Sequence, residues 1–404
     1  MLPILLLLQL TAADAAARPG PDPVFHGRAG DTSVSAPRLD ADVVVDGVLD
    51  EGVWAEAALL TGFSQYRPID GVAADDSTEV LIWYSASALY VGVRAWEPHG
   101  TVNATLADRD AVFSDDNIQL LLDTFDDQRQ AVVFAVNPLG VQADGVRNEA
   151  VSSQSGYFDA AAARRGALDL RPDFVFESRG RVTDRGYEVE VRIPFKSIRF
   201  QSADVQRWGL NVFRSVQHSG QTQTWTPMRQ GASSFLGQSG GLAGLEGLRA
   251  GLVLDLSPVV TQQVVGRPET EGWGYERNAT QVGLDARWGI TPNLTANATL
   301  NPDFSQVEAD VAQIQFDPRQ AVSFPEKRPF FLEGSENFSV PNGLIYTRSI
   351  VDPVAAAKLT GKVGGFTVAA LSAVDEDELS WAGPGAGNNP FINILRVRRD
   401  VGES

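Results

Sequence analysis

Residues 301–334 read NPDFSQVEADVAQIQFDPRQAVSFPEKRPFFLEG and separate two regions whose β-strand patterns differ. Charged and aromatic side chains are denser in this stretch than a plain linker requires. They include Glu326, Lys327, Arg328, Phe330 and Phe331. We therefore expect residues 301–340 to form a plug-like insert that docks on the strands around it.

Upstream, residues 36–249 contain many short segments in which apolar and polar side chains alternate. Residues 78–84 and 88–96 flank a short turn, and residues 174–182 and 187–193 flank another that ends in Gly186. Short, evenly spaced strands separated by turns are typical of a sandwich of two sheets. The pattern predicts an antiparallel, jelly-roll-like β-sandwich with few helices.

Downstream, residues 250–404 alternate with smaller side chains. Residues 281–288 are typical, since Gln281, Asp285 and Arg287 alternate with Val282, Leu284 and Trp288. Strands of about ten residues with one apolar and one polar face are the signature of outer-membrane proteins. Six or seven such strands follow residue 252, and closure needs at least about eight. We expect an all-β chain whose sandwich is followed by a partial antiparallel outer-membrane-type β-barrel, as part of a longer gene product.

Composition and the amino terminus indicate the compartment. The formal net charge of −18 argues against nucleic acid as a partner, and the absence of cysteine excludes disulfides and thiolate metal sites. An apolar run at residues 4–8 followed by Ala15-Ala16-Ala17 predicts a signal peptide over residues 1–17. Residues 18–35 are expected to be a flexible leader. The chain is thus expected to cross the inner membrane and reach the outer membrane or periplasm.

Five blocks in the first region carry a family resemblance. In chain order they are DGVLDEGVW, STEVLIWYSASALYVGVRAWEP, FSDDNIQLLLDT, GYEVEVRIPFKSI and WGLNVFRS. This ordered set, over about 170 residues, resembles the family 9 carbohydrate-binding module. The resemblance implies a β-sandwich that binds sugars, often through aromatic side chains, with calcium as a structural ion in some members.

Sugar rings stack on aromatic faces, and their hydroxyls need polar partners. Trp96 ends an expected strand and Trp225 lies in the polar tract QTQTWTPMRQ, so sugar binding and packing are both open for them. Period two places Asn211 on the strand face opposite Trp208 and Arg214, so one sugar does not readily contact all three. The candidate carbohydrate-binding residues are Trp96, Trp225, Arg94, Asn211, Arg214 and Trp208.

Metal and catalytic chemistry has few candidates. The run Asp115-Asp116-Asn117 offers hard oxygens for a structural calcium ion, and the alternative is a turn held by side-chain hydrogen bonds. The three histidines, His26, His99 and His218, lie in separate segments, and from their spacing we expect neither a catalytic triad nor a metal cluster.

The segments NPDFSQVEAD, SFPEKRPFFLEG and LIYTRSI resemble the carboxy-terminal region of domain of unknown function 5916 proteins. These proteins also carry a family 9-like sugar-binding domain. The two resemblances together imply carbohydrate binding at the bacterial envelope for glycan capture or uptake, with polysaccharide or oligosaccharide and outer-membrane lipid as partners.

Two alternatives stay open. The first is a carbohydrate-active enzyme component, namely an O-glycosyl hydrolase in polysaccharide catabolism. The second is a structural module without sugar binding. Glu326 and Glu333 are the carboxylates that a hydrolase would use. Ion pairing with Lys327 and Arg328 is the other explanation for these two residues.

Overall fold

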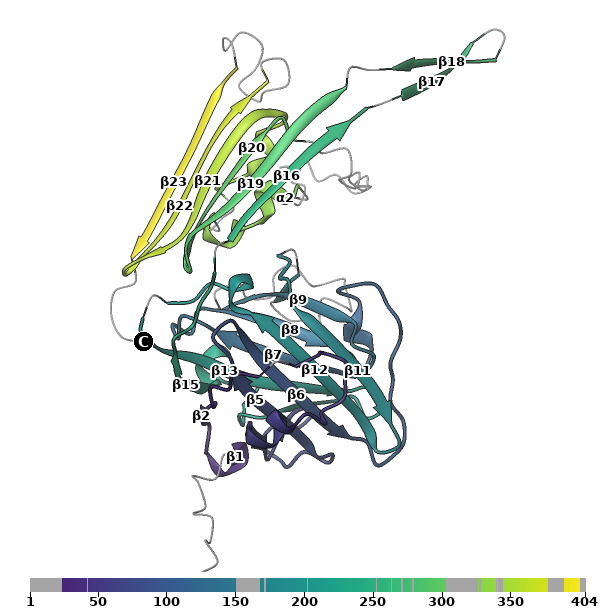
Figure 1. Cartoon of the computed structure of the whole chain (residues 1–404), viewed down its shortest axis with the longest axis vertical. Coiled ribbons are helices and arrows are strands. Elements are labelled where there is room, and N and C mark those ends of the chain that lie inside the picture. The colour runs from purple at the N-terminus through teal and green to yellow at the C-terminus, as the bar shows by residue number, and fades with distance from the viewer. Residues whose placement is uncertain are drawn as a thin grey trace, which may run out of the picture.

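Figure 1 shows the computed structural model of the chain, which describes residues 24–41, 43–149, 168–170, 172–201, 203–251, 253–262, 264–269, 272–277, 280–302, 326, 328–338, 340, 344–376 and 389–399. Strands dominate this part and its helices are short, so the prediction of an all-β protein is confirmed. None of these helices has the length and apolar character needed to cross a bilayer. The described helices are η1 (Gly27–Ala29), η2 (Gly52–Glu56), η3 (Val112–Ser114), η4 (Phe195–Ser197), η5 (Leu236–Gln238), α2 (Pro329–Leu332), η6 (Ser335–Phe338) and η8 (Thr347–Ser349).

Two sheets form the amino-terminal region (Figure 1). Sheet A has the order β1 (Val24–His26), β3 (Ala58–Thr61), β5 (Thr78–Tyr84), β6 (Ala88–Trp96), β12 (Gly186–Pro194) and β11 (Glu177–Thr183). Sheet B has the order β10 (Leu168–Asp169), β9 (Gln142–Asn148), β8 (Gln130–Val136), β7 (Asn117–Asp123), β13 (Val205–Val216), β14 (Gln221–Thr224) and β4 (Ser64–Arg67). Beside β13 lie β15 (Gly240–Glu246) and then β2 (Ser33–Ser35).

The two sheets pack face to face around one core, because alternate residues of each strand point inward. Val80, Ile82 and Val189 of sheet A and Leu122 and Trp208 of sheet B belong to this core and are fully buried. The predicted β-sandwich is therefore present over these strands.

A second apolar layer covers the outer face of sheet A. Trp54 in η2 meets Trp83 edge-on with 6.0 Å between ring centroids, and Trp83 stacks on Tyr90 at 3.9 Å. Trp83 has no exposed surface. The segment that precedes β3 thus buries this face of the sheet.

The turn between β11 and β12 explains one glycine. Gly186 has φ of +145°, and a Cβ at this position would lie 2.0 Å from the carbonyl oxygen of Ala95. Only glycine fits so close to β6. The hairpin predicted around this glycine is confirmed, with β11 and β12 pairing as antiparallel neighbours.

Part of the expected leader is folded. Val24–His26 pairs in parallel with β3, and Ser33–Ser35 pairs in parallel with β15. The prediction of a flexible segment is therefore wrong for residues 24–35. The predicted signal peptide lies outside the described residues.

The carboxy-terminal region forms one antiparallel sheet, sheet C, above the sandwich in Figure 1. Its order is β16 (Val253–Thr261), β19 (Gln281–Thr291), β20 (Leu294–Leu300), β21 (Pro353–Val363), β22 (Phe366–Asp375) and β23 (Phe391–Arg399). A separate hairpin, β17 (Val264–Glu269) and β18 (Gly272–Arg277), lies between β16 and β19 in sequence. Among the described strands β16 and β23 do not pair, so sheet C is open and no sheet is closed into a barrel.

Candidate functional site

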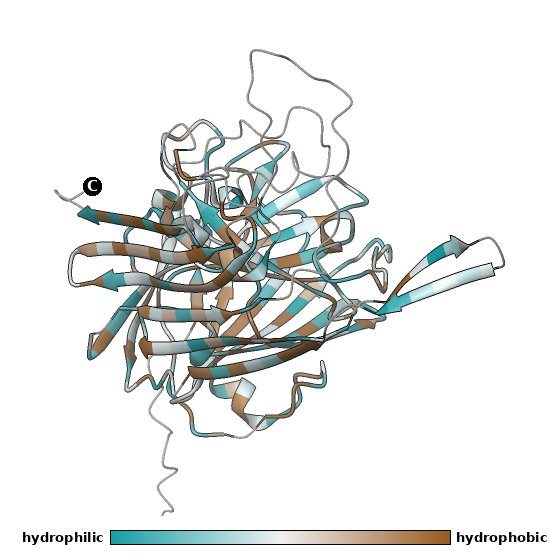
Figure 2. Cartoon of the chain, turned by 90° about the horizontal axis from the view of Figure 1, so that it is seen from above, coloured by the Kyte–Doolittle hydropathy of each residue, from teal (hydrophilic) through white to brown (hydrophobic). Residues whose placement is uncertain are grey.

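Sheet C has two chemically opposite faces. Directly paired residues point to the same face, and the registers define one row across all six strands that consists of Leu254, Trp288, Ala296, Leu359, Ala370 and Leu395. The neighbouring row on the other face begins Asp255, Arg287, Asn297, Lys358. Figure 2 shows the resulting alternation of hydrophobic and hydrophilic residues along the strands.

The apolar face is the exposed one. Leu256 is 59% exposed, Val282 64% and Leu395 73%. On the polar face Asn297 is 7% exposed, Lys358 3% and Thr360 fully buried. A sheet of a soluble protein has the reverse arrangement, with apolar side chains inward. The exposed face of sheet C therefore suits an apolar surrounding.

Residues 328–338, the main described part of the expected insert, lie against the polar face, and residues 303–325 lie outside the described residues. Glu333 lies 2.9 Å from Nε of Arg287 and accepts a hydrogen bond from Nδ2 of Asn297 at 2.6 Å. The ammonium group of Lys358 donates to the carbonyl oxygens of Phe330 and Glu333. Phe331 packs into a small apolar cluster with residues of β21 and β22. These contacts hold residues 328–338 against the strands.

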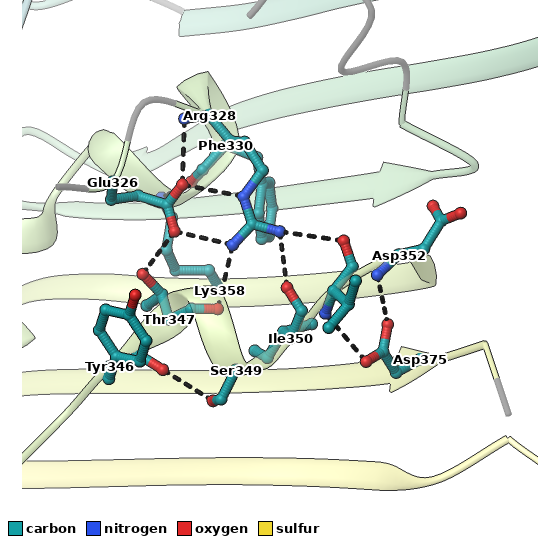
Figure 3. Close-up of polar contacts among 11 residues, drawn as sticks. Glu326, Arg328, Phe330, Tyr346, Thr347, Ser349, Ile350, Asp352, Lys358 and Asp375 are labelled. Carbon is teal, nitrogen blue, oxygen red and sulfur yellow. Dashed lines mark hydrogen bonds and ion pairs between the residues drawn. The ribbon is translucent and has the colours of Figure 1, made fainter. Parts of the chain in front are cut away.

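Figure 3 shows that Glu326 is committed to its neighbours. Arg328 donates three hydrogen bonds to its carboxylate, at 3.1 Å from the backbone N–H, 2.8 Å from Nε and 2.7 Å from Nη2. Thr347 donates a fourth at 2.6 Å. Arg328 also donates to the carbonyl oxygens of Thr347 and Ile350. The ion-pair explanation for Glu326 is confirmed, and Glu333 pairs with Arg287; Lys327 lies outside the described residues.

A cavity of about 780 Å³ separates the sandwich from sheet C. Phe125, Asp127 and Arg199 line it from the sandwich, and Arg287 and Lys362 line it from sheet C. Lys362 pairs with Asp127, and Arg199 donates to Thr360 at 3.3 Å. These two contacts connect the sandwich to the polar face of the sheet beside the cavity.

A shallow groove crosses the outer face of sheet B. Its volume is about 90 Å³, so it accommodates one edge of a sugar ring rather than an enclosed ligand. Strand alternation produces it, because Ile118, Leu120 and Leu122 of β7 point to the core while Gln119 and Leu121 point outward. The aromatic and polar lining residues are Tyr66, Arg67, Gln119, Arg147, Phe213, Ser215, Thr222 and Phe235.

Arg147 is the polar group best placed for a ligand in this groove. Its guanidinium carbon lies 3.4 Å from the ring centroid of Phe235, and Phe235 stacks on Phe213 at 5.7 Å. Burial lowers the pKa of Arg147, but an arginine keeps its charge in proteins. It makes no hydrogen bond to another described residue, so a ligand that accepts hydrogen bonds would satisfy it.

The loop that carries Phe235 is fixed from β9. The carboxylate of Glu149 accepts hydrogen bonds from the backbone N–H groups of Phe235 at 2.7 Å and Leu236 at 3.0 Å. We did not predict Arg147, Phe235 or Tyr66 from the sequence. The only local signal is a lone aromatic residue in the polar loop GASSFLGQSGG.

Four of the predicted sugar-binding residues are buried, which requires a correction. Trp208 and Trp225 have no exposed surface, Asn211 has none, and Arg214 has 1%. Trp208 packs against Phe195 at 5.9 Å between ring centroids. A ring without an exposed face offers no stacking surface, so these four residues serve packing and internal hydrogen bonding in this structure.

The other two lie on sheet A. Arg94 is half-buried and lies 3.8 Å from Glu79 and 3.6 Å from Glu188, and it donates to the carbonyl oxygen of Leu49 at 3.2 Å. Trp96 is half-buried at the end of β6. Trp96 thus stays a candidate platform, on the sheet that does not carry the groove.

The expected calcium ligands are engaged within the protein. Asp115 accepts from the backbone N–H and the hydroxyl of Thr105, both at 2.9 Å. Asp116 accepts from the N–H groups of Asn103 at 2.9 Å and Gln217 at 2.7 Å. Asn117 donates to the carbonyl oxygen of Asp115. Because these oxygens face hydrogen-bond donors, the geometry favours the turn interpretation over calcium.

Comparison with known families bears on the second region. Residues 251–360 match the family model of a domain of unknown function, DUF5916. This confirms the predicted resemblance over those residues. No curated protein matches the chain.

Solved structures resemble about half of the chain. A family 9 carbohydrate-binding module from Caldicellulosiruptor kristjanssonii in complex with glucose is 14% identical with a TM-score of 0.33, and the match covers 51% of this chain and 93% of that one. The cellotriose complex of such a module from the same organism is 15% identical with a TM-score of 0.33, and the match covers 51% of this chain and 91% of that one. A putative carbohydrate-binding protein from Bacteroides uniformis is 13% identical with a TM-score of 0.34, and the match covers 52% of this chain and 99% of that one.

Proposed function

We propose that this chain is an envelope protein whose sheet C lies in the outer membrane as part of a barrel wall and whose sandwich binds a polysaccharide or oligosaccharide for capture or uptake. The observation that carries the membrane part is the apolar row from Leu254 to Leu395, which crosses six strands on the exposed face. Keeping apolar surface in water costs roughly 25 cal/mol per Å², and lipid removes this cost.

Loop lengths support an orientation. Two residues connect β19 to β20, and two connect β21 to β22, whereas residues 262–280, 301–352 and 376–390 form the connections at the other end. Short turns face the periplasm in outer-membrane proteins and long loops face outward. Pro292 and Lys362, at the short-turn end, line cavities shared with the sandwich. The sandwich would then lie in the periplasm.

Single cysteines test this orientation, because the chain has none of its own. Glu276→Cys lies in the β17–β18 hairpin and Gly365→Cys lies in the β21–β22 turn. With a membrane-impermeant maleimide on intact cells, we expect labelling of the hairpin, and labelling of the turn only after the outer membrane is permeabilised. The reverse pattern would place the sandwich outside the cell.

The groove of sheet B supports saccharide binding. It combines a half-buried aromatic ring, Tyr66, with the guanidinium of Arg147, which makes no hydrogen bond to the described residues, and the polar side chains of Gln119 and Thr222. Aromatic rings receive the C–H faces of sugars, and the polar groups bond their hydroxyls. The five sequence blocks that resemble family 9 modules point to the same ligand class.

Isothermal titration of the full chain in detergent, with neutral and acidic oligosaccharides including cellotriose, tests the groove. A hydrogen bond to a charged group contributes about 1.5–3 kcal/mol, so Arg147→Ala should weaken binding roughly tenfold or more. Tyr66→Ala should also weaken it. Trp96→Ala, on the other sheet, is the matched control and should bind as the unaltered chain does. If only Trp96→Ala lowers the saccharide affinity, the binding site lies on sheet A instead.

The contacts across the cavity favour a second function, in which the sandwich caps the short-turn end of sheet C. The Lys362–Asp127 ion pair and the hydrogen bond from Arg199 to Thr360 tie the sandwich to the sheet. If no oligosaccharide binds, capping is the role that the geometry supports.

The hydrolase alternative gains no support from Glu326 and Glu333. A glycosidase needs one carboxyl group as an acid and a second that is free to attack or to activate water. Glu326 is held by Arg328 and Thr347, and Glu333 is held by Arg287 and Asn297. Both carboxylates therefore serve to dock the insert.

A further inference from the structure

Two of the histidines meet, contrary to the expectation from their spacing. His99 follows β6 of sheet A and His218 follows β13 of sheet B, and their ring centroids lie 5.3 Å apart. Glu97 joins them, so that one ligand atom from each of the three residues lies within 4.8 Å of the other two. The topology brings together residues 119 positions apart, which the sequence alone does not indicate.

One carboxylate oxygen of Glu97 accepts no hydrogen bond from the described residues and has a long ion pair with Arg214. Glu97 is 2% exposed, and its Oε1 accepts a long hydrogen bond from the backbone N–H of His99 at 3.3 Å. Its Oε2 is buried and has no hydrogen-bond partner among the described residues. A buried oxygen of this kind is costly unless a donor or a cation satisfies it.

The spacing of the donor atoms suits a metal ion better than a hydrogen bond. Nδ1 of His218 lies 3.6 Å from Oε2 of Glu97, beyond the usual hydrogen-bond range. Ligand atoms about 2.0–2.1 Å from a tetrahedral zinc ion lie about 3.4 Å from one another. Two imidazoles and a carboxylate form a ligand set that zinc uses, with water in the fourth position.

Both turns are held in place before any ion binds. The N–H of Gly100 donates to the carbonyl oxygen of Glu97 at 3.0 Å, which closes the first turn. In the second, the N–H of Gln217 donates to Asp116 at 2.7 Å and its side chain donates to the carbonyl oxygen of Asp115 at 2.8 Å. Little conformational entropy remains to be lost on binding.

The local charge also permits a cation. Nη2 of Arg214 lies 3.6 Å from Oε2 of Glu97, but it donates to the carbonyl oxygen of Trp96 at 2.7 Å. Asp116 interacts electrostatically with both Arg214 and His218. Two carboxylates therefore face one guanidinium, which leaves a negative charge for the ion to neutralise.

We propose that Glu97, His99 and His218 bind a divalent transition-metal ion of the zinc type, which ties the end of sheet A to the end of sheet B. The ion would stabilise the sandwich by binding the folded state only. This site is independent of the saccharide groove.

The test uses the full chain in detergent, purified with a tag that contains no histidine. We expect one Zn²⁺ per chain by titration, a melting temperature that rises with zinc concentration, and a tetrahedral visible spectrum with Co²⁺. His99→Ala and His218→Ala should each weaken zinc binding about tenfold or more. His26→Ala removes the third histidine and is the control, which should bind zinc normally.

The proposal fails if the unaltered chain binds no zinc stoichiometrically at micromolar concentration, or if the His99 and His218 variants bind as His26→Ala does. Glu97→Gln should also lose affinity. Because that change leaves Arg214 facing a neutral partner and can impair folding, the two exposed histidines decide the outcome.

Discussion

Arg214 is a buried cation that links the two sheets. Its guanidinium donates to the carbonyl oxygen of Ser77 and the hydroxyl of Thr78, each at 3.0 Å, and Glu97 lies 3.6 Å away. Removing one member of a buried ion pair leaves the other uncompensated and costs about 3–5 kcal/mol. Arg214→Ala should therefore lower the free energy of unfolding of the sandwich by about that amount.

Arg94→Ala is the control for this prediction, since the ion pairs of Arg94 with Glu79 and Glu188 are half-exposed and contribute about 1 kcal/mol or less. Urea denaturation followed by tryptophan fluorescence measures both variants. Equal losses would mean that Arg214 is not the internal link described above. Loss of saccharide affinity in the folded Arg214 variant would restore it as a binding residue.

Glu190 should make the free energy of unfolding depend on pH. Burial raises its pKa to about 7, although the N–H groups of Asp46 and Gly47 donate to its carboxylate and oppose the shift. Its usual pKa is about 4.3, so between these values the folded state binds more protons than the unfolded state. Stability from this group is therefore present below about pH 4 and is lost as the pH rises through 7.

Glu190→Gln should flatten the fall in unfolding free energy between pH 5 and pH 8, because glutamine keeps an oxygen for the two N–H donors and has no proton to lose. Urea denaturation at several pH values measures the difference between the two proteins. An identical slope in both would show that Glu190 is ionised in the folded state throughout this range.

At the scale of the strand, β16 offers a matched comparison. Leu256 points to the apolar face of sheet C and Ser257 points to the polar face. Arginine on a lipid-facing position costs about 2–4 kcal/mol near the bilayer centre and less near its edges. Leu256→Arg should reduce assembly into lipid vesicles, whereas Ser257→Arg should have a small effect. Equal effects would contradict a lipid-facing apolar side.

The strands and their faces were predictable, because alternation with period two is a local property of the sequence. It correctly placed Asn211 opposite Trp208 and Arg214: Trp208 lies in the inner core, while Asn211 contacts Thr226 and Met228. Alternation does not tell which faces another segment covers. Thr226 and Met228 lie against the outer face of β13, so the side chain of Asn211 is buried there.

The candidate sites were not predictable for a different reason. Arg147 contacts Phe235, which is 88 residues later in the sequence, and His99 contacts His218, which is 119 residues later. Each pair depends on the order of strands in a sheet or on the packing of two sheets. Such long-range neighbours follow from the topology, which no short motif in this chain specifies.

For the whole molecule, the central claim is that sheet C separates lipid from a polar interior while the sandwich lies at its short-turn end. On the polar face, Arg287, Asn297 and Lys358 hold Phe330 and Glu333 against the strands. The cavity of about 780 Å³ connects this interior to the sandwich.

The most direct measurement is spin-label accessibility along β19 in the reconstituted chain, which needs no removal of native cysteines. Leu284→Cys and Trp288→Cys should carry labels that are accessible to oxygen dissolved in lipid and shielded from a water-soluble nickel complex. Labels at Asp285→Cys and Arg287→Cys should be shielded from the lipid. Uniform accessibility at all four positions, or water access at positions 284 and 288, would contradict the account.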